Sequence, residues 1–322
     1  MKTLFDKTML AGLPMKNRLV RSATGDCLAT KEGYITAAIF DLYEELAVGG
    51  VALIILGYTA VTEVDPFSQG MLRLSNDTLV PEYARLAACI HNHGAHVMPQ
   101  LALGTYQRRV EDDELVTLGV NDMTNGDIAT VVQCFIDAAR RAKEAGFDGV
   151  QLHGCHKVLL SEFLRPKRNH RIDAYVGSVI GRTRIVVEII RSIHEILGDF
   201  HVSIKLNNTD IPLDECVETC KILEQAGLDS LEMEWLYPQL HEARRECLKV
   251  PIILTGEHRG PESMEQLMGE EGIEYFGLSR PLIREPDLPK RWQSGWREEA
   301  NCTSCDRCLL QPPRGCVYRP RS

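Results

Sequence analysis

Long hydrophobic runs and an excess of basic residues are both missing from this sequence of 322 residues. No stretch approaches the about 20 apolar residues of a membrane helix. Asp6, Lys7 and Lys16 interrupt the N-terminal segment, which argues against a signal peptide. The 36 Lys and Arg residues are outnumbered by 45 Asp and Glu residues, giving a formal net charge of −9. We therefore expect a cytoplasmic protein with neither nucleic acid nor a membrane as partner.

A glycine-rich dinucleotide motif is also missing. No G-x-G-x-x-G follows the first predicted strand, which argues against a doubly wound nucleotide-binding sheet. Eight short apolar runs recur instead, most of them continuous rather than alternating, as in parallel strands buried on both faces. They predict strands over residues 18–23, 51–57, 96–101, 148–153, 201–206, 229–234, 251–256 and 274–279.

Amphipathic segments separate these runs. Between residues 126 and 146, apolar side chains recur every three or four positions, and Gly146 follows the end of the pattern. Eight strands alternating with helices predict a (β/α)8 TIM barrel, an α/β fold in which about 250 residues form one domain. We expect the barrel over residues 1–285 and a short Cys-rich C-terminal tail over residues 286–322, packed on the barrel.

The residues at the ends of the predicted strands are polar or glycine in nearly every case. In a barrel, these ends and the loops after them form the active face, so they predict a ligand site by position alone. The strand-end residues are Ser22, Ala23, Thr24, Gly57, Gln100, His153, Lys205, Glu234, Gly256, Ser279 and Arg280.

Two histidines, His153 and His156, close the fourth predicted strand and open the next loop. Their imidazoles offer either two N–H donors to an anionic oxygen or two nitrogens to a metal. Zinc would need further His, Asp or Glu ligands from other strand ends, and only Glu234 is available there. A single histidine would as readily cap a helix or lie on the surface, but the pair favours a functional site.

Other strand ends carry groups suited to a phosphate and to a flavin ring. Gly256, Ser279 and Arg280 follow the seventh and eighth strands, where barrels commonly bind phosphate. The alternative is that the glycine merely ends a strand and the arginine pairs with an acid. Gln100 and Lys205 could hold the pyrimidine edge of a flavin, with the lysine stabilising the negative charge of the reduced ring.

Several long motifs resemble those of the old yellow enzyme family of FMN oxidoreductases, in a short single-domain form. They follow the family's order over residues 2 to 308. The motifs are "LFDKTMLAGLPMKNRLVRSAT", "EELAVGGVALIILG", "CIHNHGAHVMPQL", "AARRAKEAGFDGVQLHGCH", "SEFLRPKRNHRIDAYVGS" and "FGLSRPLIREPDLP".

The resemblance implies a site for FMN and a role for the histidine pair. The implied FMN contacts are Ser22, Ala23 and Thr24 along the flavin, Gly57 and Gln100 at the ring, Lys205 beside N1 and O2, and Gly256, Ser279 and Arg280 at the phosphate. His153 and His156 would bind the carbonyl or phenolate oxygen of a ligand stacked on the flavin. In such enzymes NAD(P)H reduces FMN, and hydride then passes from flavin N5 to the β-carbon of an α,β-unsaturated compound.

Three departures from the family pattern bear on the reaction. Lys157 and Val158 stand where the family has glycine and tyrosine, and that tyrosine is the usual proton donor. "YVGSVIGR" replaces Y-G-G-S-x-E-N-R, and the segment between Leu101 and Asp127 is short and lacks the usual H-x-G-R. We expect flavin binding to be intact, while ordinary ene-reduction is placed in question because valine cannot donate a proton.

The eleven cysteines divide into two groups. Seven are scattered, as small buried thiols of a reducing cytoplasm usually are. The other four, Cys302, Cys305, Cys308 and Cys316, are spaced as C-x2-C-x2-C-x7-C. This spacing is of the type that binds a 4Fe–4S cluster, with a four-thiolate zinc site and a metal-free tail or disulfide pair as alternatives.

Three functions from different classes fit the sequence. The first is an FMN-dependent NAD(P)H oxidoreductase that reduces a conjugated small molecule. The second, suggested by Val158, is a flavin-binding barrel with altered or lost turnover that acts as a binding or regulatory subunit. The third is a metal-dependent lyase or hydrolase using His153, His156 and Glu234. A homo-oligomer is compatible with each.

Overall fold

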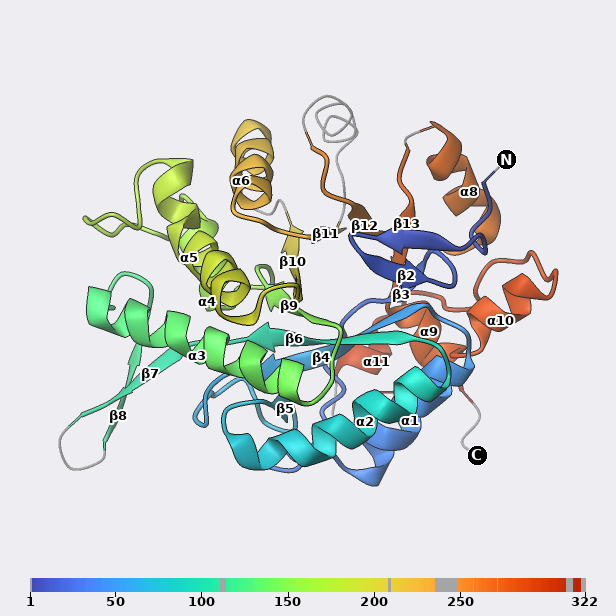
Figure 1. Cartoon of the computed structure of the whole chain (residues 1–322), viewed down its shortest axis with the longest axis horizontal. Helices are drawn as coiled ribbons and strands as arrows, with labels where there is room; N and C mark the ends of the chain where they lie inside the picture. The colour runs from blue at the N-terminus through green and yellow to red at the C-terminus, as the bar shows by residue number, and fades with distance from the viewer. Residues whose placement is uncertain are drawn as a thin grey trace.

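A closed ring of eight parallel strands organises the chain (Figure 1). The computed structural model describes residues 2–110, 114–207, 210–234, 248–256, 258–270, 272–310 and 315–319. The barrel strands are β3 (Leu19–Arg21), β4 (Leu53–Ala60), β6 (His96–Ala102), β9 (Gly149–His153), β10 (His201–Asn207), β11 (Ser230–Glu234), β12 (Ile252–Thr255) and β13 (Tyr275–Leu278). Each pairs in parallel with the next, and β13 returns to β3, which pairs with β4. The predicted (β/α)8 barrel is confirmed.

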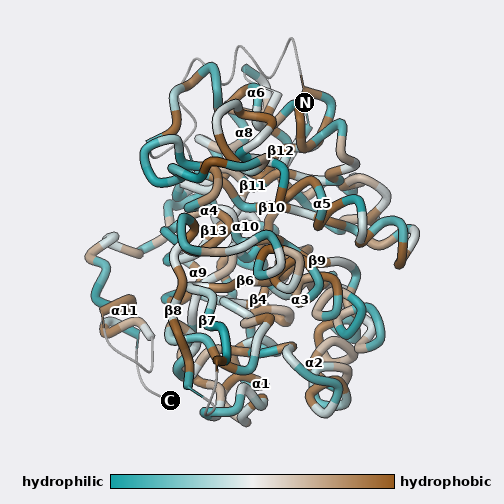
Figure 2. The backbone as a smooth tube through the Cα atoms, turned by 90° about the vertical axis from the view of Figure 1, so that its left-hand side faces the viewer, coloured by the Kyte–Doolittle hydropathy of each residue, from teal (hydrophilic) through white to brown (hydrophobic). Residues whose placement is uncertain are grey.

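The barrel strands are buried on both faces, which explains their continuous apolar runs. Every residue of β4 and β9 is buried, and Ile54, Leu152 and Ile204 are fully inaccessible. Figure 2 shows the hydrophobic stretches gathered in the strands and on the inner sides of the helices.

The helices lie around the outside of the ring. They are α1 (Ala37–Val48), α2 (Val80–Asn92), α3 (Asn125–Glu144), α4 (Leu159–Leu164), α5 (Val179–Leu197), α6 (Leu213–Gln225), α8 (Pro261–Glu270), α9 (Arg280–Arg284), α10 (Leu288–Gln293) and α11 (Arg307–Leu310), with a 3-10 turn at Asp77–Leu79. Helix α3 begins as its sequence indicates, because Thr124 and Asp127 form a reciprocal capping box, and Gly146 after its end has a φ of 80°. None of the helices among the described residues combines the length and hydrophobicity needed to cross a bilayer.

Three small strand pairings lie outside the ring and were not predicted. One hairpin joins β1 (Thr8–Leu10) to β2 (Leu13–Met15), and another joins β7 (Tyr106–Arg109) to β8 (Leu115–Leu118). The short β5 (Leu72–Arg73) extends β4. Their two to four residues are too short, and most are too exposed, to give a clear apolar pattern.

Part of the segment after residue 285 belongs to the main core. Leu288 and Trp292 of α10 are buried in the same hydrophobic cluster as the barrel helices, and Trp292 donates its indole N–H to the Glu298 carbonyl. The cysteine-bearing segment with α11 lies at the edge of the molecule (Figure 2). The domain boundary at residue 285 remains a prediction.

Candidate active site

The carboxyl ends of the barrel strands enclose a cavity of about 490 Å³, within the range of small-molecule sites. Of the strand-end residues predicted to bind FMN or substrate, the structure brings together all except Ser22 and Gly57 on its wall. Those that line it are Ala23, Thr24, Gln100, His153, His156, Lys205, Gly256, Ser279 and Arg280. Residues of six different strands or their following loops therefore meet at one place, because parallel strands end at the same face.

Lys205 lies at the floor of this cavity between two carboxylates. Its Nζ is 3.1 Å from Glu232 Oε1 and 2.9 Å from Glu234 Oε1, and its side chain is 2% exposed. Burial alone would lower the pKa of Lys205, but the two carboxylates raise it above its usual value. Burial would likewise raise the pKa of Glu234, whereas the hydrogen bond from His156 and the charge of Lys205 lower it to about 2. Lys205 is thus a fixed cation held between two carboxylates.

Glu232 connects that lysine to residues of three other strands or their ends, a role that the sequence did not reveal. It accepts hydrogen bonds from Ser22 Oγ at 2.5 Å, Gln151 Nε2 at 2.7 Å and Thr255 Oγ1 at 2.8 Å. Gln151 in turn accepts one from Gln100 Nε2 at 2.8 Å. Because every partner is buried, the network fixes the floor, and Gln100 is held where its remaining groups face the cavity.

Ser22 and Gly57 support the site from outside the cavity. Ser22 Oγ accepts from Lys205 Nζ at 2.9 Å, so it lies beneath the floor. Gly57 is packed against the main chain, since a Cβ atom there would lie 2.2 Å from the Thr24 carbonyl oxygen. Its N–H donates to Tyr43 Oη at 2.8 Å, and that hydroxyl donates to Asp26. Both residues support neighbouring parts of the site, and their contact with FMN remains a prediction.

The histidine pair surrounds a buried cysteine. Cys155 Sγ lies 3.6 Å from His153 Nδ1 and 3.5 Å from His156 Nδ1, and the ring centroids of the histidines are 5.2 Å apart. On its other side, His156 Nε2 lies 2.7 Å from Glu234 Oε2. The cysteine was not assigned to the pair from sequence, whereas Glu234 was grouped with the two histidines in the metal-dependent alternative.

The environment of His153 determines its protonation. Burial lowers its pKa well below the usual value, and the neighbouring charges of His156 and Lys205 add to this effect, so the ring is neutral. Burial also raises the pKa of the Cys155 thiol, which therefore keeps its proton and can donate to His153 Nδ1. Donation of the thiol proton to Nδ1 would place the ring proton of His153 on Nε2. His153 is then a neutral N–H donor at the cavity wall.

Val158 is buried against Tyr58, Ala60 and Ala102, with Met71 beside them. The Tyr58 ring also meets His153 edge-on at a centroid distance of 6.3 Å, and its hydroxyl donates to Asp65. Tyr58 and Met71 line the cavity, although neither was predicted to do so. The position of the family's tyrosine is therefore filled by packed hydrophobic groups.

The opposite end of the cavity carries the predicted phosphate-binding groups. Gly256 has an open Cα, because an added Cβ would meet only His258 Nε2, at 3.8 Å. Thr24 and Ser279 join their hydroxyls at 2.8 Å, and Arg280 Nη1 lies 2.6 Å from Asp306. The alternative considered above, in which Arg280 pairs with an acid, is thus correct in part, since the arginine does so while lining the cavity.

All four clustered cysteines line one small cavity of about 20 Å³ beside this end of the site. Arg280 and Asp306 line both cavities, so the cysteines adjoin the candidate phosphate site. Among the described residues, no three of the four sulfur atoms lie within 4.8 Å of one another. A tetrahedral zinc with bonds of about 2.3 Å would draw its sulfurs to about 3.8 Å apart.

A closed parallel barrel with a charged cavity at its carboxyl ends is the architecture of barrel enzymes that bind a small ligand there. The chain belongs to the NADH:flavin oxidoreductase / NADH oxidase family, whose model matches residues 3–227. This finding confirms the resemblance to the old yellow enzyme family.

Curated relatives cover nearly the whole chain. An NADH oxidase of Thermoanaerobacter brockii is 30% identical over 97% of this chain and 56% of its own length. A metal reductase of Desulforamulus reducens is 26% identical over 96% and 52%, respectively. The chain thus spans about half the length of these two relatives. An NADPH dehydrogenase of Listeria welshimeri is 30% identical over 90% of this chain and 94% of its own.

Solved structures share the fold. A 2-naphthoyl-CoA reductase in complex with 2-naphthoyl-CoA superimposes with a TM-score of 0.88 at 21% identity, covering 99% of this chain and 57% of that one. Morphinone reductase in complex with tetrahydroNAD gives a TM-score of 0.78 at 21% identity, covering 93% of each chain.

Proposed function

We propose that this protein is an FMN-dependent oxidoreductase that takes hydride from NADH or NADPH and reduces a conjugated, carbonyl-type small molecule. One observation carries the proposal: the groups suited to a flavin ring and those suited to its phosphate line a single cavity. The names of the relatives, NADH oxidase and NADPH dehydrogenase, support a nicotinamide donor.

The cavity fits FMN by its chemistry. Lys205 supplies a permanent cation beside Gln100, matching the oxygen- and nitrogen-rich edge of the ring. The open Gly256 backbone, Ser279 and Arg280 would hold the phosphate. When bound, FMN carries a hydride from a nicotinamide donor to an electron-poor double bond.

The chain's own residues would bind and polarise the substrate. His153, neutral and protonated on Nε2, would donate a hydrogen bond to the substrate oxygen and stabilise the negative charge that develops there. His156 is held to Glu234, which orients it at the cavity wall. Val158 donates no proton and is packed away, so we expect water to protonate the substrate carbon.

The test is an anaerobic titration of the purified, FMN-loaded protein with NADH and, separately, NADPH. We expect bleaching of the flavin absorbance by at least one donor and its return when a conjugated enone is added. Flavin that binds but is not reduced by either donor would favour the binding or regulatory subunit. Protein that takes up zinc and no flavin would overturn the proposal in favour of the metal-dependent alternative.

We further propose that Cys302, Cys305, Cys308 and Cys316 bind a 4Fe–4S cluster rather than zinc. All four line one cavity, and their sulfurs are spread more widely than a single tetrahedral zinc would require. Anaerobically purified protein should contain about four iron and four sulfide per chain. Cys308→Ser should lose both while keeping FMN, and stoichiometric zinc in place of iron would contradict the cluster.

A further inference from the structure

A second cavity, of about 370 Å³, opens beside the candidate active site and has no lining residue in common with it. Its wall carries Lys157, Lys167, Arg168 and His170. Glu162, the only carboxylate among the described residues of its wall, already accepts hydrogen bonds from Arg165 at 3.2 Å and Arg168 at 2.8 Å. No described residue forms an ion pair with Lys157 or Lys167. The cavity therefore has a net positive charge available to a ligand.

The backbone at the boundary between the two cavities adopts an uncommon conformation. His156 and Lys157 are consecutive residues with φ values of 59° and 64°, in the left-handed region that glycine enters at much lower cost. His156 lines the first cavity and Lys157 the second. The turn thus directs one side chain to each site, and a strained lysine at this point indicates a function for its charge.

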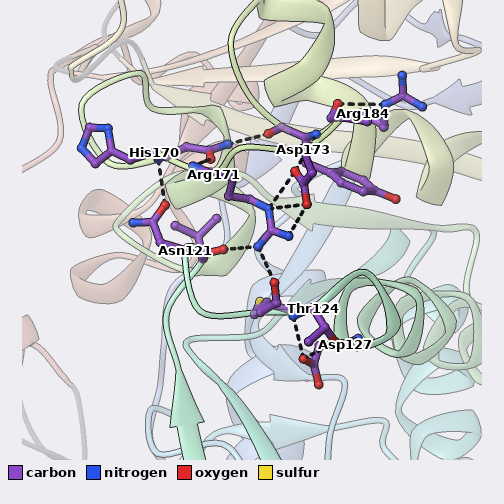
Figure 3. Close-up of polar contacts among 12 residues, drawn as sticks. Asn121, Thr124, Asp127, His170, Arg171, Asp173 and Arg184 are labelled. Atoms are coloured by element: carbon purple, nitrogen blue, oxygen red, sulfur yellow. Dashed lines mark hydrogen bonds and ion pairs between the residues drawn. The ribbon is translucent and has the colours of Figure 1, made fainter.

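The second cavity is built between two loops that are fastened together (Figure 3). Asn121 donates its amide to the Arg168 carbonyl at 3.0 Å and accepts from the His170 N–H at 2.7 Å. Arg171 donates to the carbonyls of Val120 and Met123 at 2.5 Å and 2.7 Å, and its guanidinium is paired with Asp173. These bonds hold the backbone of Arg168 and His170 in place before any ligand arrives, which lowers the entropic cost of binding there.

We propose that this cavity binds the diphosphate arm of a nucleotide-bearing reactant whose reacting group occupies the first cavity. The inference rests on the proposed function, since a nicotinamide donor carries such an arm. An acyl thioester of coenzyme A carries the same adenosine diphosphate unit, so either reactant supplies the chemistry that the cations recognise. Phosphate oxygens accept charge-assisted hydrogen bonds from lysine and arginine.

The test measures the binding of ADP itself by calorimetry, in excess FMN so that the flavin phosphate site is filled. The variant is the double substitution Lys157→Gln and Lys167→Gln, which removes two charges and keeps a non-glycine residue in the left-handed turn. The matched control is Lys249→Gln, an exposed lysine that precedes β12 at the opposite end of the barrel. Thermal melting and FMN content confirm that each variant is folded.

We expect ADP affinity to fall about tenfold in the double variant and to stay unchanged in Lys249→Gln. Equal ADP affinity in all three proteins, or no ADP binding to the wild type, would overturn the proposal. This readout does not depend on turnover. If ADP binds as expected while neither NADH nor NADPH reduces the flavin, the proposed function fails and the nucleotide site stands.

A second measurement identifies the reactant. Stopped-flow reduction compares NADH with N-benzyl-1,4-dihydronicotinamide, which has no phosphate. If the hydride donor binds in the cavity, the double substitution weakens the binding of NADH about tenfold and leaves the binding of the truncated donor unchanged. If the acceptor uses it, NADH is unaffected and coenzyme A displaces ADP from the wild type about tenfold more strongly than from the variant.

Discussion

The same three strands carry polar groups at both ends, and the two ends differ in what those groups face. At their amino ends, β6, β9 and β10 present His96, Asp148 and His201; at their carboxyl ends they present Gln100, His153 and Lys205. The first set bonds only to other parts of the protein, whereas the second also lines a cavity.

At the amino end, Asp148 joins three groups of neighbouring elements. It accepts from His91 Nε2 at 2.8 Å, His96 Nδ1 at 2.6 Å and the Val97 N–H at 2.7 Å. Burial would raise the pKa of Asp148, but the hydrogen bonds from His91 and His96 hold it well below the usual range. Every acceptor is satisfied by protein, which is the arrangement expected of a structural network.

At the carboxyl end, the charges are fixed but not all donors are used. Lys205 is held by two carboxylates, and His153 lines the cavity with the Cys155 thiol beside its Nδ1. Burial and ion pairing alone therefore do not identify a ligand site. A hydrogen-bond donor that faces a cavity without a protein partner does. We expect substitutions at the carboxyl end to affect ligands and those at the amino end to affect stability.

The largest effect is expected from His153→Ala. Removing a preorganised donor to a developing oxyanion typically lowers turnover about 100- to 1000-fold, or about 3–4 kcal/mol of barrier. We expect this loss in steady-state enone reduction, with FMN content unchanged. His201→Gln, at the amino end of the adjacent strand, serves as the control and should retain turnover. Equal losses of turnover in the two variants would contradict the expected difference between the two ends of the strands.

The second effect concerns pH. Burial lowers the pKa of His201 to about 4, below the unfolded value of about 6.5. Since the folded state disfavours protonation, this group lowers the free energy of unfolding as pH falls below about 6.5, by about 3 kcal/mol at pH 4. His96 acts oppositely: its pKa is raised by Asp148 despite burial, so its contribution is present at low pH and lost as pH rises through its folded pKa.

Urea unfolding of the wild type and His201→Gln at pH 7 and pH 4.5 measures the His201 contribution. The variant should lose less stability on acidification than the wild type. His93→Gln, which removes a more exposed histidine near Glu44, should behave as the wild type does. Identical pH dependence in all three proteins would show that burial of His201 has no such consequence.

A smaller effect is expected from Val158→Tyr. Val158 is 4% exposed and packed with Tyr58, so a tyrosine there overfills the pocket and costs about 2 kcal/mol of stability. We expect lower thermal stability and no gain in enone turnover, with Val158→Ile as a milder control. A stable Val158→Tyr enzyme with faster turnover would show that the missing proton donor limits the reaction.

The positions of the eight barrel strands could be predicted because buried parallel strands are continuous apolar runs in a single sequence. The convergence of Gln100, His153 and Lys205 followed from the topology of a barrel. The role of Glu232 could not be predicted, since its partners come from three other strands. The packing of Val158 on Tyr58 depends in the same way on contacts between distant segments.

The positively charged second cavity could not be predicted from the sequence either, although Lys157 departs from the family pattern. Its cations come from Lys157 and from residues 167–170, and only the bonds of Asn121 and Arg171 show how the second of these segments is fastened to the loop around Asn121. The spacing of the four cysteines could be read from the sequence, but their position beside Arg280 became known only from the structure. The cytoplasmic location and the oligomeric state remain predictions.

Two FMN dissociation constants test the difference between the two ends of the strands most directly. One is that of Lys205→Met and the other that of Asp148→Asn, each measured on folded protein. We expect Lys205→Met to weaken FMN by about 100-fold, because it removes the cation of the floor and leaves Glu232 and Glu234 without their partner. Asp148→Asn should lower the free energy of unfolding by about 2 kcal/mol and keep FMN affinity within about twofold. FMN bound as tightly by Lys205→Met as by the wild type would contradict the account.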